Sequence, residues 1–276
     1  MTRTAEGVVE VDGGAISWEA AGAGPAVTFL HPGLWDRRTW DDQFGLFSGA
    51  YRVVRYDARG YGRSSRPEPG RPYSHVRDLM EVLDAAGVER TALVGCSMGG
   101  GIEIDAALEH PDRVTALVLV APGLGGFEGT PEEEAAWEAW EGERGAPIEA
   151  AIEAGDLESA QGLRLRSLWA PLGTEDPAGR RIREIALDNL QELTMDESAA
   201  ATLDPPAAAR LSEILAPTLV LPADHDPPWH RRICEVLVEQ IPNARLMQIP
   251  ETDHVLNMRK PAEFNAAVLA FLGEVL

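Results

Sequence analysis

Short runs rich in valine, isoleucine and leucine alternate with amphipathic stretches along most of the chain. The runs predict strands over residues 8–11, 15–19, 26–30, 52–56, 91–95, 116–120, 218–221 and 245–249. The stretches between them predict helices over 41–48, 74–86, 98–109, 230–240 and 262–272. Such alternation is typical of an α/β fold, in which helices flank a mostly parallel sheet. The first two strands, separated by Asp12-Gly13-Gly14, are expected to form a hairpin.

This alternation stops between residues 123 and 210, where alanine- and glutamate-rich helical segments follow one another without a strand pattern. The segment holds 19 acidic residues against seven arginines and no lysine. It also contains Trp137, Trp140 and Trp169, which an acidic solvated tail would not need. We therefore expect residues 123–210 to form a helical cap inserted after the sixth strand, with its apolar faces inward. Residues 1–122 and 211–276 would form the core domain.

Composition narrows the class of protein. The 276 residues are 45% hydrophobic and 25% charged, which is ordinary for a globular protein. The net charge of −21 repels phosphate backbones and anionic lipid, and this argues against nucleic-acid and membrane-surface partners. No apolar run reaches the roughly 18 residues of a membrane span, and the start lacks the pattern of a secretory signal. Two cysteines cannot build a disulfide framework, so we expect a cytoplasmic protein.

The segment 91–101, Thr-Ala-Leu-Val-Gly-Cys-Ser-Met-Gly-Gly-Gly, carries the clearest chemistry. It is a predicted strand, a glycine-flanked turn and the start of a helix, and Gly-x-Ser-x-Gly in that context predicts a nucleophile elbow that exposes Ser97 Oγ. The helix that begins there directs unpaired N–H groups toward developing negative charge. The alternatives are a glycine-rich turn with an incidental serine, and Cys96 as nucleophile. Cys96 is better explained as a buried small hydrophobe.

Further motifs resemble those of the α/β-hydrolase superfamily, in particular its serine esterases, enol-lactone hydrolases and perhydrolases. Residues 30–36 are similar to the oxyanion loop after the third strand, with Pro32 replacing the usual glycine, and residues 56–64 match the turn after the fourth strand. Residues 223–226 resemble the segment with the triad acid, and residues 252–264 resemble the terminus with the histidine. Nucleophile, acid and histidine follow in the family's order. The resemblance implies an eight-stranded, mostly parallel sheet flanked by helices.

A serine hydroxyl is a weak nucleophile, so it needs a histidine base and a carboxylate that orients the imidazole. Of six histidines, we expect His254, on a loop after the final strand, to be the base. The other histidines are placed in the oxyanion loop, in predicted helices or beside the candidate acid: His31, His75, His110, His225 and His230.

Two aspartates compete for the role of triad acid. The family's Gly-x-x-Asp spacing, with Ala223 in the glycine position, favours Asp226, whereas Asp224 is interpreted as a turn residue. A second departure is Asp253, which stands where the family has glycine before the histidine. Asp253 is either a solvated loop acid or a charge close to the imidazole that raises the pKa of His254.

The resemblance also implies two oxyanion donors, the backbone N–H groups of Met98 and Gly33, with Leu34 in reserve. Fixed dipoles of this kind stabilise the charge that acyl transfer places on one oxygen. Leu34 and Trp35 are expected to bind substrate, although plain packing is the alternative for Trp35.

The residues together predict a serine hydrolase that cleaves a small ester or lactone through an acyl-enzyme. The same triad serves hydrolysis of carbon–carbon bonds and acyl transfer, and both stay open, as does a non-catalytic ligand-binding protein. No dinucleotide loop or metal constellation accompanies the motifs, so we expect no cofactor and no metal. The expected partner is a small-molecule substrate, and the protein is expected to be a monomer or homodimer.

Overall fold

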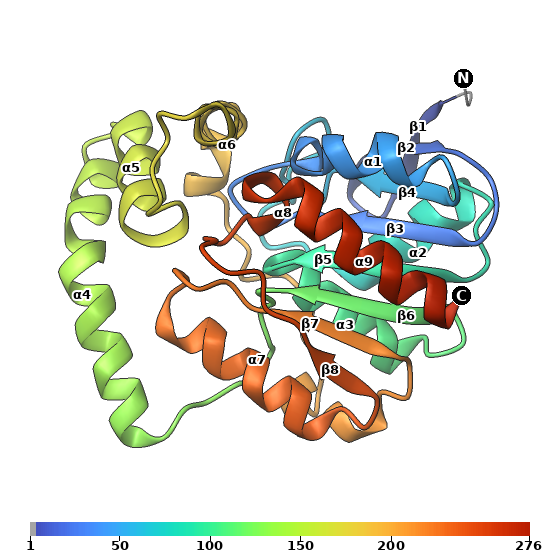
Figure 1. The fold of residues 1–276 in the computed structure, drawn as a ribbon. Helices are drawn as coiled ribbons and strands as arrows, with labels where there is room; N and C mark the ends of the chain where they lie inside the picture. The colour runs from blue at the N-terminus through green and yellow to red at the C-terminus, as the bar shows by residue number, and fades with distance from the viewer. Residues whose placement is uncertain (1–3) are drawn as a thin grey trace.

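The computed structural model describes residues 4–276, and an eight-stranded sheet forms its centre (Figure 1). The strand order is β1-β2-β4-β3-β5-β6-β7-β8. β2 pairs antiparallel with β1 and β4, and all other neighbours are parallel. The predicted fold class is therefore confirmed. The strands are β1 (Ala5–Val11), β2 (Gly14–Ala21), β3 (Ala26–Leu30), β4 (Arg52–Tyr56), β5 (Thr91–Cys96), β6 (Val114–Val120), β7 (Thr218–Leu221) and β8 (Ala244–Leu246).

All eight predicted strands are present, and the first two form the expected hairpin. The largest difference concerns β8, which was expected over 245–249 but ends at Leu246. Among the described residues β8 pairs only with β7, which ends at Leu221, and Leu246 already pairs with Val220. One more hydrogen bond, from Met247 N to Val220 O (3.0 Å), follows before the chain leaves the sheet.

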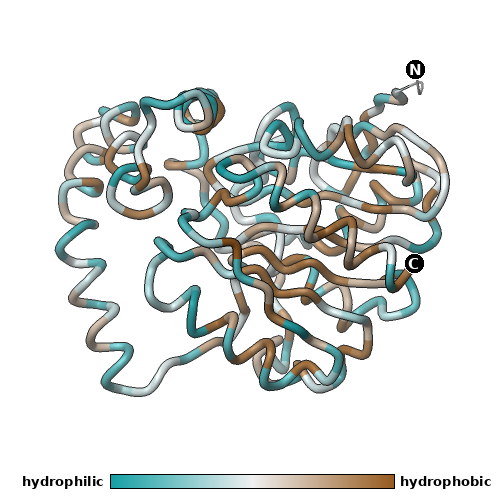
Figure 2. The backbone as a smooth tube through the Cα atoms, viewed as in Figure 1, coloured by the Kyte–Doolittle hydropathy of each residue, from teal (hydrophilic) through white to brown (hydrophobic). Residues whose placement is uncertain are grey.

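Helices cover both faces of the sheet, and central strand residues are buried between them. Apolar residues of α2, α3 and α7 pack on one face, and those of α1 and α9 on the other. Figure 2 shows hydrophobic residues along the central strands and polar ones on the outer loops. The helices are α1 (Asp41–Phe47), α2 (His75–Ala85), α3 (Met98–Glu109), α7 (Pro228–Gln240), α8 (Leu256–Arg259) and α9 (Pro261–Val275).

The chain between β6 and β7 forms α4 (Pro131–Glu153), α5 (Leu157–Arg164), α6 (Pro177–Leu187) and short helical turns. No named strand of the described residues lies in this segment. Its three helices stand beside the core rather than on either face of the sheet (Figure 1). We call residues 123–210 the helical segment. None of the helices within residues 4–276 is both long and apolar enough to cross a membrane.

Candidate active site

Ser97 occupies the sharp turn between β5 and α3 with φ 52° and ψ −113°. This backbone is rare for a residue with a side chain and persists only where its surroundings fix it. Three hydrogen bonds do so: Ser97 N donates to Val120 O (3.0 Å), and Ser97 O accepts from Gly101 N (3.0 Å) and Gly123 N (2.9 Å). The side chain of this half-buried serine stands at the carboxyl end of a central strand.

Glycines on both sides of the turn allow α3 to approach the sheet closely. A Cβ atom at Gly99 would lie 2.4 Å from Leu30 O, and one at Gly95 would lie 2.2 Å from Glu103 Oε1. Real Cβ atoms do not tolerate such distances. The Gly-x-Ser-x-Gly pattern is thus required by packing at these positions.

His254 and Asp226 meet on the loops that follow β8 and β7. Nδ1 of His254 lies 2.9 Å from Oδ1 of Asp226, and each side chain is 2% exposed. Donation from Nδ1–H to the carboxylate leaves Nε2 as an acceptor, which is the tautomer that a general base requires. Asp224 instead accepts from Glu251 N (2.7 Å) and from the Gln248 side chain, so it orders its loop.

The Ser97 turn and the His254 loop are in contact through Cys96, the residue next to Ser97. Sγ of Cys96 donates to the backbone oxygen of His254 at 3.3 Å. Complete burial raises the pKa of the Cys96 thiol well above its usual range, which disfavours a thiolate nucleophile. Within residues 4–276, Ser97 Oγ and His254 share no direct hydrogen bond. Such bonds are often long in free enzymes and tighten when substrate binds.

The expected oxyanion donors lie after two neighbouring parallel strands, β3 and β5. Met98 is the first residue of α3, so its N–H has no acceptor within the helix. Gly33 lies in the loop after β3, and His31 orders that loop. Nδ1 of His31 donates to Pro32 O (2.8 Å), and Nε2 accepts from Ala58 N (2.9 Å).

Leu34 and Trp35, the expected substrate contacts, are buried between the core and the helical segment. Leu34 is 6% exposed and Trp35 is completely buried. Trp35 Nε1 donates to Ile182 O of α6 (2.9 Å), and its ring centroid lies 6.5 Å from that of His254. Their packing joins α6 to the edge of the site.

Two further side chains contact the histidine, and sequence reasoning missed both. The ring centroid of Trp169, from the helical segment, lies 4.5 Å from that of His254, and that of His230 lies 5.0 Å away. Nδ1 of His230 lies 3.3 Å from Pro122 O, and burial lowers the pKa of His230 to about 4. The sequence held one signal for His230: it follows Asp226 by four residues, and α7 begins between the two, so both lie at the same end of that helix.

Asp253 is not a solvated loop acid, so that expectation is wrong. Its side chain is fully buried, and it pairs with Arg259 through Nε (3.0 Å) and Nη2 (2.8 Å). Arg259 follows six residues later on α8, and the sequence pattern did not show that this short helix turns back over the loop.

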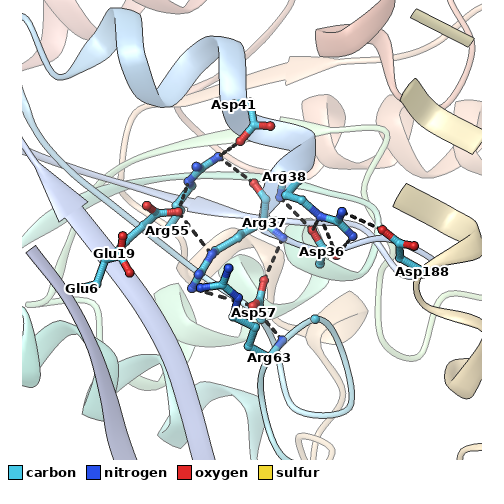
Figure 3. A pocket seen from close by; sticks show the side chains of 11 residues that line it. Glu6, Glu19, Asp36, Arg37, Arg38, Asp41, Arg55, Asp57, Arg63 and Asp188 are labelled. Carbon is cyan, nitrogen blue, oxygen red and sulfur yellow. Dashed lines mark hydrogen bonds and ion pairs between the residues drawn. The ribbon is translucent and has the colours of Figure 1, made fainter. Parts of the chain in front are cut away.

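A separate polar pocket of about 430 Å³ lies where the β3 and β4 loops meet the helical segment (Figure 3). Arg38 pairs there with Asp36 (2.7 Å) and with Asp188 (2.8 Å) of the helical segment. Arg55 likewise pairs with Glu19 (2.8 Å). The pair of Arg38 with Asp188 therefore joins the core to the helical segment at this pocket.

Comparison with known proteins agrees with this geometry. The sequence pattern described as alpha/beta hydrolase fold matches residues 29–261. A protein of Bacillus subtilis (strain 168), provisionally named 2-succinyl-6-hydroxy-2,4-cyclohexadiene-1-carboxylate synthase, is 26% identical over 95% of each chain. Among solved structures, Est816, described as an N-acyl homoserine lactone degrading enzyme, is 28% identical with a TM-score of 0.73, over 96% of this chain and 100% of that one.

The enol-lactonase of Burkholderia xenovorans LB400 has the same fold, with a TM-score of 0.77 at 22% identity over 97% of this chain and 100% of that one. The family match spans both the elbow and the His254–Asp226 pair. The family expected from the motifs is confirmed: this chain belongs to the α/β hydrolase fold family.

Proposed function

We propose that this protein is a serine hydrolase that cleaves a small carboxylic ester or lactone through an acyl-enzyme. The observation that carries the proposal is the 2.9 Å contact of His254 with Asp226 beside a strained serine elbow. A buried carboxylate on Nδ1 stabilises the imidazolium that forms when Nε2 takes a proton. That arrangement serves nucleophilic catalysis, whereas a binding protein has no need of it.

In the proposed reaction, Ser97 Oγ attacks the substrate carbonyl while its proton passes to His254 Nε2. The N–H groups of Gly33 and Met98 stabilise the oxyanion. The tetrahedral intermediate collapses, the C–O bond breaks, and the leaving oxygen takes the proton from His254. Water then gives a proton to His254 and attacks the acyl group, which releases the acid and restores Ser97.

We propose that the helical segment serves as a cap over this reaction. The ring of Trp169 packs at a tilt against the imidazole of His254, and the hydrogen bond from Trp35 to Ile182 O joins α6 to the loop after β3. Apolar cover of this kind strengthens the electrostatic interactions within a site by excluding water. The cap favours uncharged acyl groups, and its excess of acidic residues disfavours polyanionic substrates.

Turnover measurements on three classes of substrate distinguish hydrolysis of esters, of lactones and of carbon–carbon bonds. Purified protein is assayed against p-nitrophenyl esters of increasing chain length, a set of lactones and one vinylogous diketone. Ser97→Ala is the matched control. We expect ester or lactone turnover that Ser97→Ala lowers by roughly 10⁶ in kcat. Turnover of the diketone alone, or transfer to an added alcohol or thiol without hydrolysis, would contradict the proposal.

A further inference from the structure

Asp226, His230 and His254 form a compact group of metal-type donors. One ligand atom from each lies within 4.8 Å of the others. Two imidazoles and one carboxylate are the donors that zinc takes in many catalytic sites, where a fourth position stays open. The group comes from two loops and the first turn of α7, so small movements can bring the donors closer together.

The unused lone pairs of this group point to a ligand. Oδ2 of Asp226 is buried and has no hydrogen-bond partner among the described residues, although Oδ1 is bound by His254. Nδ1 of His230 faces Pro122 O at 3.3 Å, and donation there leaves the Nε2 lone pair of a neutral ring unused. An unpaired buried carboxylate oxygen is costly, and a cation offsets that cost.

We propose that Asp226, His230 and His254 bind a divalent transition-metal ion, such as Zn²⁺, and that the bound ion switches the hydrolase off. Zinc holds nitrogen and oxygen ligands at about 2.0–2.2 Å, so its ligand atoms stand roughly 3–3.5 Å apart. The 2.9 Å separation of His254 Nδ1 and Asp226 Oδ1 is slightly shorter than this, so these two atoms have to move apart by a few tenths of an ångström to admit the ion. Donor atoms that lie up to 4.8 Å apart also have to approach one another, and His230 is the donor outside the hydrogen-bonded pair.

Inhibition follows from the proton on His254. A metal ion at Nδ1 takes the place of that proton, and the proton moves to Nε2, so the ring stays neutral. Nε2–H is a donor and cannot accept the proton of Ser97. The bound ion therefore leaves the site without a general base. The inhibitory effect rests on the proposed function, whereas binding of the ion does not.

Binding is measured by calorimetric titration of ZnCl₂ into the wild type, Ser97→Ala, His230→Asn and His225→Asn, with MgCl₂ as the control ion. His230→Asn keeps a side-chain N–H for Pro122 O. His225, which is exposed and lies in the same loop as Asp226, is the control histidine. We expect one Zn²⁺ site in the wild type, Ser97→Ala and His225→Asn. His230→Asn should weaken it at least about tenfold, because even indirect partners of a metal contribute tenfold or more.

Residual ester hydrolysis of each variant, relative to its own metal-free rate, gives the second readout. Zn²⁺ should inhibit the wild type, EDTA should reverse the inhibition, and His230→Asn should resist it. Equal Zn²⁺ affinity in a folded His230→Asn, or no site in Ser97→Ala, would overturn the proposal. If His230→Asn does not fold, the Zn²⁺ affinity of Asp226→Asn decides in the same way. Zinc binding without any hydrolysis of esters or lactones would count against the proposed function alone.

Discussion

Arg259 donates two hydrogen bonds to the carboxylate of Asp253, the residue beside His254, from Nε to Oδ1 (3.0 Å) and from Nη2 to Oδ2 (2.8 Å). The side chains are 5% and 0% exposed. Nη2 also donates to Gly173 O (2.7 Å), in the helical segment. One arginine thus connects the loop of the proposed base to the proposed cap.

Loss of this arginine should destabilise the protein strongly. Arg259→Met leaves the Asp253 carboxylate buried without its charged partner, which costs about 3–5 kcal/mol in the free energy of unfolding. Adding Asp253→Asn should restore part of that loss. The exposed pair of Arg183 and Glu158 (3.5 Å) supplies the control, where Arg183→Met should cost about 1 kcal/mol or less. Urea unfolding measures all four proteins, and equal losses for the two arginine variants would refute a structural role for the Asp253 pair.

The two aspartates after β7 should differ sharply in their effect on turnover. Asp226→Asn presents the wrong imidazole tautomer and should lower kcat by roughly 10⁴. Asp224→Asn should have a small effect, because Asp224 accepts from Glu251 N and not from a histidine. Steady-state kinetics with one uncharged ester compares them. A larger loss of kcat in Asp224→Asn than in Asp226→Asn would show that Asp226 is not the triad acid.

Burial of Glu103 behind the elbow should make stability depend on pH. Both carboxyl oxygens are buried without a partner among the described residues, and burial raises the pKa of Glu103 well above its ordinary 4.5. The unfolded chain ionises near that ordinary value. The contribution of neutral Glu103 to stability is therefore complete below pH 4.5 and is lost as the pH rises toward the folded-state pKa.

Glu103→Gln removes this titration. Between pH 5 and pH 7, the free energy of unfolding of the wild type should fall relative to Glu103→Gln by up to about 1.4 kcal/mol per pH unit. Urea titrations at three pH values measure the difference, with Glu109→Gln at the exposed end of the same helix as the control. A constant difference between wild type and Glu103→Gln would show that Glu103 has the same charge in both states.

Trp169 should affect catalysis more than the other tryptophans of the helical segment. Trp169→Ala removes the ring that packs on His254, and a base displaced by about 1 Å loses up to roughly a hundredfold in kcat/KM. Trp140 packs on Trp229, with ring centroids 5.3 Å apart, so Trp140→Ala is the matched control. Similar kcat/KM values for both variants would show that the helical segment does not act on His254.

Much of the fold could be predicted because its signals are local. Each strand is a short apolar run, and the elbow is a single segment from Thr91 to Gly101. The end of β8 was missed because it depends on where β7 ends, which is a property of the neighbouring strand.

The environment of the site could not be predicted in the same way. Contacts of Trp169 and His230 with His254 join residues that lie far apart in the sequence, through the packing of the helical segment and α7. The burial of Asp253 depends on a turn that brings Arg259 back over it. Charge patterning alone indicates a solvated acid at such a position, because an unpaired carboxylate is seldom buried.

The central claim is that Ser97 forms a covalent bond with the substrate's acyl group, and a fluorophosphonate inhibitor tests it most directly. The folded protein is incubated with the inhibitor, digested and mapped by mass spectrometry, with heat-unfolded protein and Ser97→Ala as controls. The account predicts one adduct, on Ser97, that appears together with loss of esterase activity and is absent from both controls. An adduct on another residue, or full activity in Ser97→Ala, would contradict it.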